Sequence, residues 1–96
     1  MSTQTLPDHV ETLIIGAGLA GLSTALHLGP AHNLLVVEAN DYVGGKARTE
    51  RIGDFLFDVT GHWLHLRDPG IRALIFSLLG EDHFHKVDRI SRIWSH

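Results

Sequence analysis

The sequence predicts an α/β fold that begins with a strand–helix–strand unit, and three observations support this prediction. An apolar run at 11–15 leads directly into the pattern Gly-x-Gly-x-x-Gly at 16–21. A helical pattern follows, and a second apolar run at 34–37 ends in Glu38, seventeen residues after the last glycine. Because strand, glycines, helix, second strand and acid come in the order that a dinucleotide requires, we expect a Rossmann-like unit.

The three glycines each have a separate predicted task. Gly16 makes the tight turn after the strand, Gly18 lets the backbone approach a pyrophosphate, and Gly21 lets the helix pack closely against the sheet. We expect the helix to begin at about Leu19, with its unpaired N–H groups and positive dipole end directed at the phosphates. The predicted phosphate-binding residues are Gly16, Ala17, Gly18, Leu19, Ala20 and Gly21.

The first helix and the second strand place an acid beside the expected nucleotide. Gly29 and Pro30 form a stop signal for the helix, whose leucines at 19, 22 and 26 share one stripe. The run at 34–37 is typical of a parallel strand that is covered on both faces. A right-handed crossover then brings Glu38 to the crevice for the adenosine ribose, where its carboxylate can accept from both hydroxyls and would repel the 2′-phosphate of NADP. The alternative is a unit whose glycines only pack, with Glu38 as a solvated strand end.

Later signals predict a hairpin and a second helix, and the doubly wound sheet is expected to be incomplete. The hairpin arms lie near 48–52 and 55–59, around Gly53 and Asp54, and the helix runs from about Pro69 or Gly70 to Leu79, with Asp68 as its N-cap and Gly80 past its end. Residues 89–96 resemble the start of another strand. We therefore expect a flexible N-terminus at 1–9 and the N-terminal part of a dinucleotide-binding Rossmann domain at 10–96, since a complete sheet of this kind has about five or six strands.

Composition excludes several classes of function. The 96 residues carry a net charge of −3 with eight scattered basic residues, which argues against binding to nucleic acid or an anionic membrane. We expect no transmembrane segment and no secretory signal, and therefore a cytoplasmic location. There is no cysteine, and the histidine pairs at 62 and 65 and at 83 and 85 do not supply the three or four ligands of a zinc site, so we expect no metal.

A second glycine motif points to a longer cofactor. The segment Gly44-Gly45-Lys46-Ala47-Arg48-Thr49 begins six residues after Glu38. A nicotinamide dinucleotide needs no such element there, whereas flavin adenine dinucleotide (FAD) must pass its pyrophosphate and ribityl chain along a further stretch of backbone. Small residues allow that approach, and the two cations can form charge-assisted hydrogen bonds. The alternative is an ordinary loop with a solvated basic face.

Three segments form a further pattern: Glu38-Ala39, the segment 44–49, and Phe57-Asp58-Val59-Thr60-Gly61-His62. Together they resemble the flavin amine oxidase superfamily, which includes amine oxidases, protoporphyrinogen oxidase, carotenoid desaturases and UDP-galactopyranose mutase. The resemblance spans about residues 11–94 and corresponds to the N-terminal part of a longer protein of the protoporphyrinogen oxidase-like or mutase-like branch. It implies an FAD site in which the first glycines hold the pyrophosphate, Glu38 the ribose, and Gly61 and His62 lie near the isoalloxazine ring. Its other expected members are Ala39, Gly44, Gly45, Lys46, Arg48 and Thr49.

The chain departs from the amine oxidase pattern at Tyr42 and Lys46, where many members have arginine, and at Thr60, where mutase-like members often have glycine. The resemblance implies an FAD-dependent oxidoreductase that transfers a hydride from a small-molecule substrate to flavin N5. No catalytic residue can be named, and we expect the 96 residues to be inactive alone, with the remainder of a parent chain completing the fold. The alternatives are a mutase-like flavin isomerase, a non-catalytic fragment and an NAD-dependent dehydrogenase.

Overall fold

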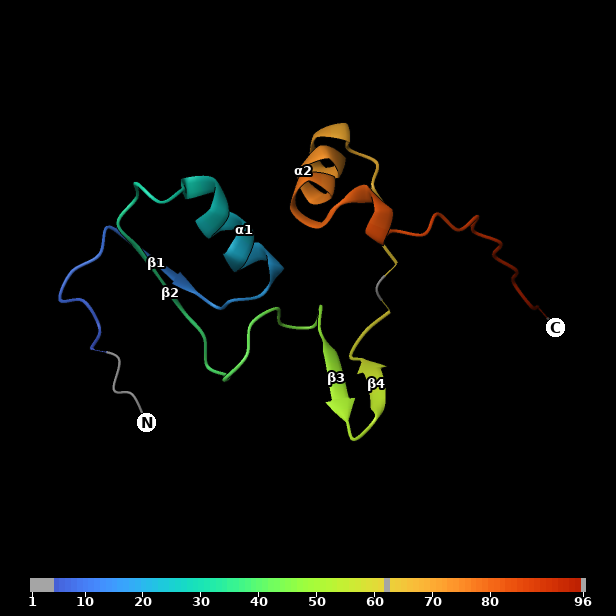
Figure 1. Cartoon of the computed structure of the whole chain (residues 1–96), viewed down its shortest axis with the longest axis horizontal. Coiled ribbons are helices and arrows are strands. Elements are labelled where there is room, and N and C mark those ends of the chain that lie inside the picture. Colours follow the sequence, from blue (N-terminus) through green and yellow to red (C-terminus); the bar gives the residue numbers. More distant parts are fainter. Residues whose placement is uncertain (1–4, 62, 96) are drawn as a thin grey trace. The chain divides into compact units, whose positions relative to one another are not determined.

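The computed structural model describes residues 5–61 and 63–95, which belong to two compact units divided between His62 and Trp63. The first four residues of the predicted flexible N-terminus lie outside the described residues. The first unit contains β1 (Thr12–Ile15), α1 (Leu19–Leu28), β2 (Leu34–Val37), β3 (Thr49–Ile52) and β4 (Phe55–Asp58). The second contains α2 (Pro69–Leu79) and the 3₁₀ helix η1 (Glu81–His83). This order of elements is shown in Figure 1.

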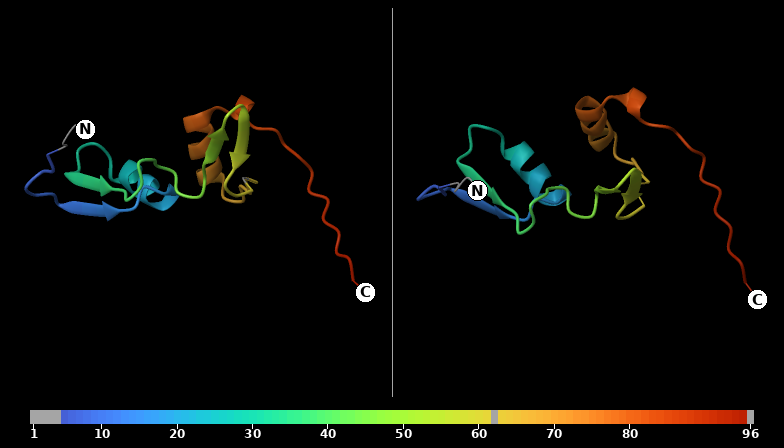
Figure 2. Two further views of the ribbon diagram at one scale, coloured as in Figure 1. Left: turned by 90° about the horizontal axis from the view of Figure 1, so that it is seen from below. Right: turned by 60° about the horizontal axis from the view of Figure 1, so that its bottom comes forward.

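The first unit begins with the predicted parallel β–α–β arrangement. Strand β1 pairs with β2 in parallel, with Thr12 opposite Leu34 and Ile15 opposite Val37. Helix α1 contacts both strands and lies over one face of the pair, as Figures 1 and 2 show. A parallel pair needs a crossover connection, and the helix supplies it. The structure thus confirms a mixed α/β, Rossmann-like fold.

Helix α1 packs through small residues and not through its leucine stripe. A Cβ atom at Gly21 would collide with the carbonyl oxygen of Gly16 and would lie 3.3 Å from Cγ2 of Ile14. The helix therefore approaches the strand so closely that only glycine fits at this point. The leucines of the stripe, at 19, 22 and 26, are exposed. This confirms the packing role predicted for Gly21, whereas the leucine stripe does not mark the face that lies against the sheet.

The predicted hairpin is present, with arms one residue shorter at their outer ends. Strands β3 and β4 are antiparallel, with Thr49 opposite Asp58 and Ile52 opposite Phe55. The turn uses Gly53 at φ +61°, a left-handed conformation that glycine adopts without a steric penalty. Beyond the strands, the amide of Val59 still donates to the carbonyl of Arg48 at 3.1 Å.

Helix α2 has the predicted caps. The carboxylate of Asp68 accepts from the amide of Ile71 at 2.9 Å, Pro69 stands in the first turn, and Gly80 follows the last helical residue with φ +82°. The ring of Phe76 packs against Phe84, with centroids 5.4 Å apart. In the described part of the chain, no helix is long and apolar enough to cross a membrane.

The predicted strand from residue 89 is wrong for the residues that the structure describes. Residues 84–95 have no regular secondary structure. A strand requires a partner for its backbone N–H and C=O groups, and this segment pairs with no strand among the described residues. An apolar, β-prone composition alone does not create a strand.

Candidate functional site

Both glycine motifs meet in the structure. The amide of Gly44 donates to the carbonyl of Ala17 at 2.7 Å, and Gly18 and Gly44 form a single parallel β-bridge. A Cβ atom at Gly45 would lie 3.3 Å from Cα of Gly18. The loop at 44–45 therefore runs directly against the loop at 16–18, although the sequence separates them by a helix and a strand.

Backbone conformation explains the need for two adjacent glycines. Gly44 has φ +99° and Gly45 has φ +60°, both in the left-handed region that other residues adopt with strain. Ala17 lies beneath this contact, and among the described residues it is the one fully buried hydrophobic residue, at 2% exposure. The two loops thus form a close backbone junction with little side-chain volume.

Glu38 fixes the first loop through its carboxylate. Its Oε2 accepts from the amide of Ala17 at 2.8 Å, and its Oε1 accepts from the amide of Asn40 at 3.0 Å and from Nδ2 of Asn40 at 2.9 Å. The bond from Ala17, and then that from Asn40, lowers the pKa of Glu38 below its ordinary value of 4.5. The side chain is therefore held as a carboxylate in one orientation.

These bonds restrict what Glu38 can offer a ribose. A carboxylate has about four acceptor positions, and three are already in use. About one position, on Oε2, is left, so accepting from both ribose hydroxyls requires the amide of the Asn40 side chain to move. Asn40 was not predicted as a site residue. The available signal was an amide side chain two residues after the acid, since asparagine commonly bonds to nearby groups.

The N-terminus of α1 lies at the same junction. The helix begins at Leu19, as predicted, and its N-cap is Gly18, which has no side chain to bond the amides of the first turn. A Cβ atom at Gly18 would meet no atom of the chain within 4 Å. The amides of Leu19 and Ala20 belong to this first turn, where a helix dipole favours an anion.

The predicted cationic segment is anchored to the hairpin. The guanidinium of Arg48 pairs with Glu50 at 2.6 Å and lies over the ring of Tyr42, 4.0 Å from its centroid. The carbonyl of Lys46 accepts from the hydroxyl of Thr60 at 3.1 Å. The interactions of Arg48 thus direct its charge toward Tyr42 and Glu50. Neither of these partners was predicted as a site residue.

The remaining predicted site residues are more dispersed. The hydroxyl of Thr49 donates to the carboxylate of Asp58 across the hairpin at 2.6 Å. Ala39 is exposed next to Glu38, Gly61 is exposed after β4, and His62 lies outside the described residues. The roles predicted for Gly61 and His62 near a flavin therefore stay predictions.

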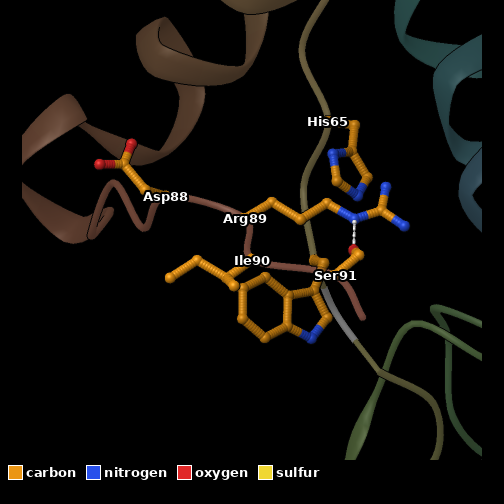
Figure 3. Close-up of a pocket in the computed structure, with 6 residues that line it drawn as sticks. His65, Asp88, Arg89, Ile90 and Ser91 are labelled. Atoms are coloured by element: carbon orange, nitrogen blue, oxygen red, sulfur yellow. Dashed lines mark hydrogen bonds between the residues drawn. The ribbon is translucent and has the colours of Figure 1, made fainter. Parts of the chain in front are cut away.

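A separate hollow of about 490 Å³ belongs to the second unit. Within it, Nε of Arg89 donates to the hydroxyl of Ser91 at 2.9 Å, as Figure 3 shows. Trp63, which lines the hollow, is exposed. No three His, Asp or Glu residues of the described segments converge as a metal site would require. The lining residues are Trp63, His65, Asp88, Arg89, Ile90 and Ser91.

Residues 14–78 match the family model of the NAD(P)-binding Rossmann-like domain. The chain belongs to this family. The match begins within β1, covers the glycine junction, Glu38 and the hairpin, and ends within α2. The two glycine loops and Glu38 thus lie within the matched segment.

Curated relatives of the chain include oxidoreductases. The chain is 43% identical over 75 residues to "Phytoene dehydrogenase" of Streptomyces griseus, covering 77% of the chain and 14% of the relative. It is 50% identical over 50 residues to "L-amino acid oxidase Cdc18" of Crotalus durissus cumanensis, covering 51% and 10%. A Mycobacterium tuberculosis protein whose name describes a flavin-containing monoamine oxidase is 34% identical over 73 residues, covering 75% and 16%. The chain thus spans a small share of each relative, and no solved structure matches it significantly.

Proposed function

We propose that the chain is the FAD-binding portion of a flavin-dependent oxidoreductase. The contact between the loops at 16–18 and 44–45 carries this proposal. A nicotinamide dinucleotide needs only the first loop and the acid after β2, whereas FAD also needs a second stretch of closely approachable backbone. The bond from Gly44 to Ala17 and the approach of Gly45 to Gly18 provide that stretch beside the first loop.

The residues of the junction fit the parts of FAD. The open side of Gly18 and the first turn of α1 suit the pyrophosphate, because backbone amides can approach it there. Glu38, fixed as a carboxylate, suits the adenosine ribose. Bound FAD supplies two-electron redox chemistry at its isoalloxazine ring. The residues of this chain bind the dinucleotide and orient it.

The proposed oxidoreductase is of the amine oxidase and protoporphyrinogen oxidase type. The relatives named as a dehydrogenase and as oxidases of amines and amino acids support this choice. The chain spans only 10–16% of the length of these relatives, so the substrate is to be sought in the whole protein.

The test is to purify the whole protein and identify its bound cofactor. We expect flavin absorbance, release of FAD on denaturation as identified by mass spectrometry, and reconstitution of the stripped protein with FAD. NAD⁺ should not replace FAD at comparable concentration. A protein that binds NAD⁺ and cannot be loaded with flavin would be a nicotinamide-dependent dehydrogenase, contrary to the proposal.

A further inference from the structure

A pocket of about 570 Å³ is lined by Glu38 and by residues of the segment that follows it. Its volume is within the range of about 300–1,000 Å³ that small-molecule sites occupy. Tyr42 provides its one aromatic side chain, which is 39% exposed. The lining residues are Glu38, Asn40, Asp41, Tyr42 and Val43.

Contacts with neighbouring residues position the ring of Tyr42. The guanidinium of Arg48 lies over one face of the ring, 4.0 Å from its centroid, in the geometry of a cation–π contact. Arg48 is in turn paired with Glu50 of β3 at 2.6 Å, and its side chain is only 26% exposed. Glu50 thus orients Arg48, and Arg48 covers one face of the Tyr42 ring, so a flat ligand group would stack on the opposite face.

The charge of the pocket indicates which part of a dinucleotide it suits. Glu38 and Asp41 both contribute carboxylates, which repel phosphate. An uncharged aromatic base carries no such penalty and gains from stacking on a ring. A ribose that bonds to Glu38 would carry its base next to this carboxylate. Tyr42 lines the same pocket, so the base would lie near its ring.

We propose that Tyr42 is the stacking surface for the adenine base of the bound dinucleotide, and that Arg48 and Glu50 position its ring. The proposal rests on the proposed function for the identity of the ligand. Many amine oxidases have arginine where this chain has Tyr42, and the proposal assigns a function to this difference. The aromatic ring replaces a cation at this point, and the cation of Arg48 supports it from the other face.

The test compares two flavins on the stripped whole protein. Flavin mononucleotide (FMN) lacks the adenosine half of FAD, so a base-stacking residue affects the Kd for FAD and leaves that for FMN unchanged. We expect Tyr42→Leu to raise the Kd for FAD by about 5- to 150-fold, the range of one stacked base. Tyr42→Phe, which keeps the ring and loses the hydroxyl, should remain within about twofold of the original protein.

Two outcomes overturn the proposal. An unchanged Kd for FAD in Tyr42→Leu shows that the ring does not stack, and an equal loss of FAD and FMN binding shows that Tyr42 only supports the loop at 44–45. If Tyr42→Leu does not fold, Tyr42→Gln gives the same comparison without an aromatic ring. If the original protein binds NAD⁺ and not FAD, the proposed function fails, and NAD⁺ against nicotinamide mononucleotide then tests Tyr42 independently.

Discussion

Glu38 joins two segments of the candidate site through its two carboxylate oxygens. One oxygen holds the amide of Ala17 in the first glycine loop, and the other holds Asn40. These donors stabilise the charged form, so the folded-state pKa is below the ordinary value of 4.5. The bonds hold the carboxylate in one orientation and leave about one acceptor position, on Oε2, for a ribose.

The pH dependence of this contact follows from the sign of the shift. A carboxylate with a depressed pKa stabilises the fold fully above its ordinary value of 4.5, and this contribution is lost as the pH falls through the lower, folded-state pKa. We expect the amide proton shift of Ala17, followed by NMR from about pH 6 to about pH 3, to titrate with a midpoint below 4.5. Asn40→Ala, which removes one donor, should move the midpoint upward.

A matched control separates this titration from general acid effects. In Glu38→Gln the low-pH transition of the Ala17 amide should disappear, because the variant side chain does not ionise. A midpoint at or above 4.5 in the original protein would contradict the bonds described for Glu38.

At the scale of elements, local signals predicted most of the fold. The caps of α2, the stop after α1 and the turn at Gly53 depend on neighbouring residues alone, and the structure confirms them. The close approach of Gly21 to the sheet was predicted from the glycine motif, and the structure confirms it. The contact between the two glycine loops and the support of Tyr42 by Arg48 and Glu50 could not be predicted in this way. Both arise from tertiary contacts, and the sequence pattern of one segment does not indicate which other segment it contacts.

Gly18 and Gly21 of the first glycine motif have different surroundings, so the same substitution can be compared at both positions. A side chain at Gly18, where φ is −77° and ψ −175°, enters open space and adopts an ordinary extended conformation. We expect Gly18→Val to purify without FAD, with a free energy of unfolding within about 1 kcal/mol of that of the flavin-free original protein. Gly21→Val should instead destabilise the fold by about 1–3 kcal/mol or more, because its side chain collides with the carbonyl of Gly16.

Denaturant unfolding and flavin content, measured on both variants of the whole protein, check this prediction. A Gly18→Val protein with a normal load of FAD would show that no phosphate approaches the backbone there. An undiminished stability of Gly21→Val would contradict the close packing of α1 on β1.

At the scale of the whole chain, much apolar surface is left for further contacts. Helix α1 covers one face of the two-stranded sheet, and on the other face Leu13 is 53% and Ile15 83% exposed. The aromatic residues of the hairpin, Phe55 and Phe57, are exposed as well. Two-stranded sheets are marginal by themselves in water, so the loops at the candidate site gain limited support from these elements.

We therefore expect the 96 residues alone to bind FAD at least about 100-fold more weakly than the whole protein, a difference of about 3 kcal/mol. The reason is pre-organisation: a loop that is not held in its binding conformation spends binding free energy on becoming ordered. Equilibrium dialysis with FAD, together with a denaturant titration of each protein, measures both quantities. Equal affinity in the two proteins would show that the glycine junction and Glu38 suffice to hold the cofactor, and that the exposed face of β1 has no part in binding.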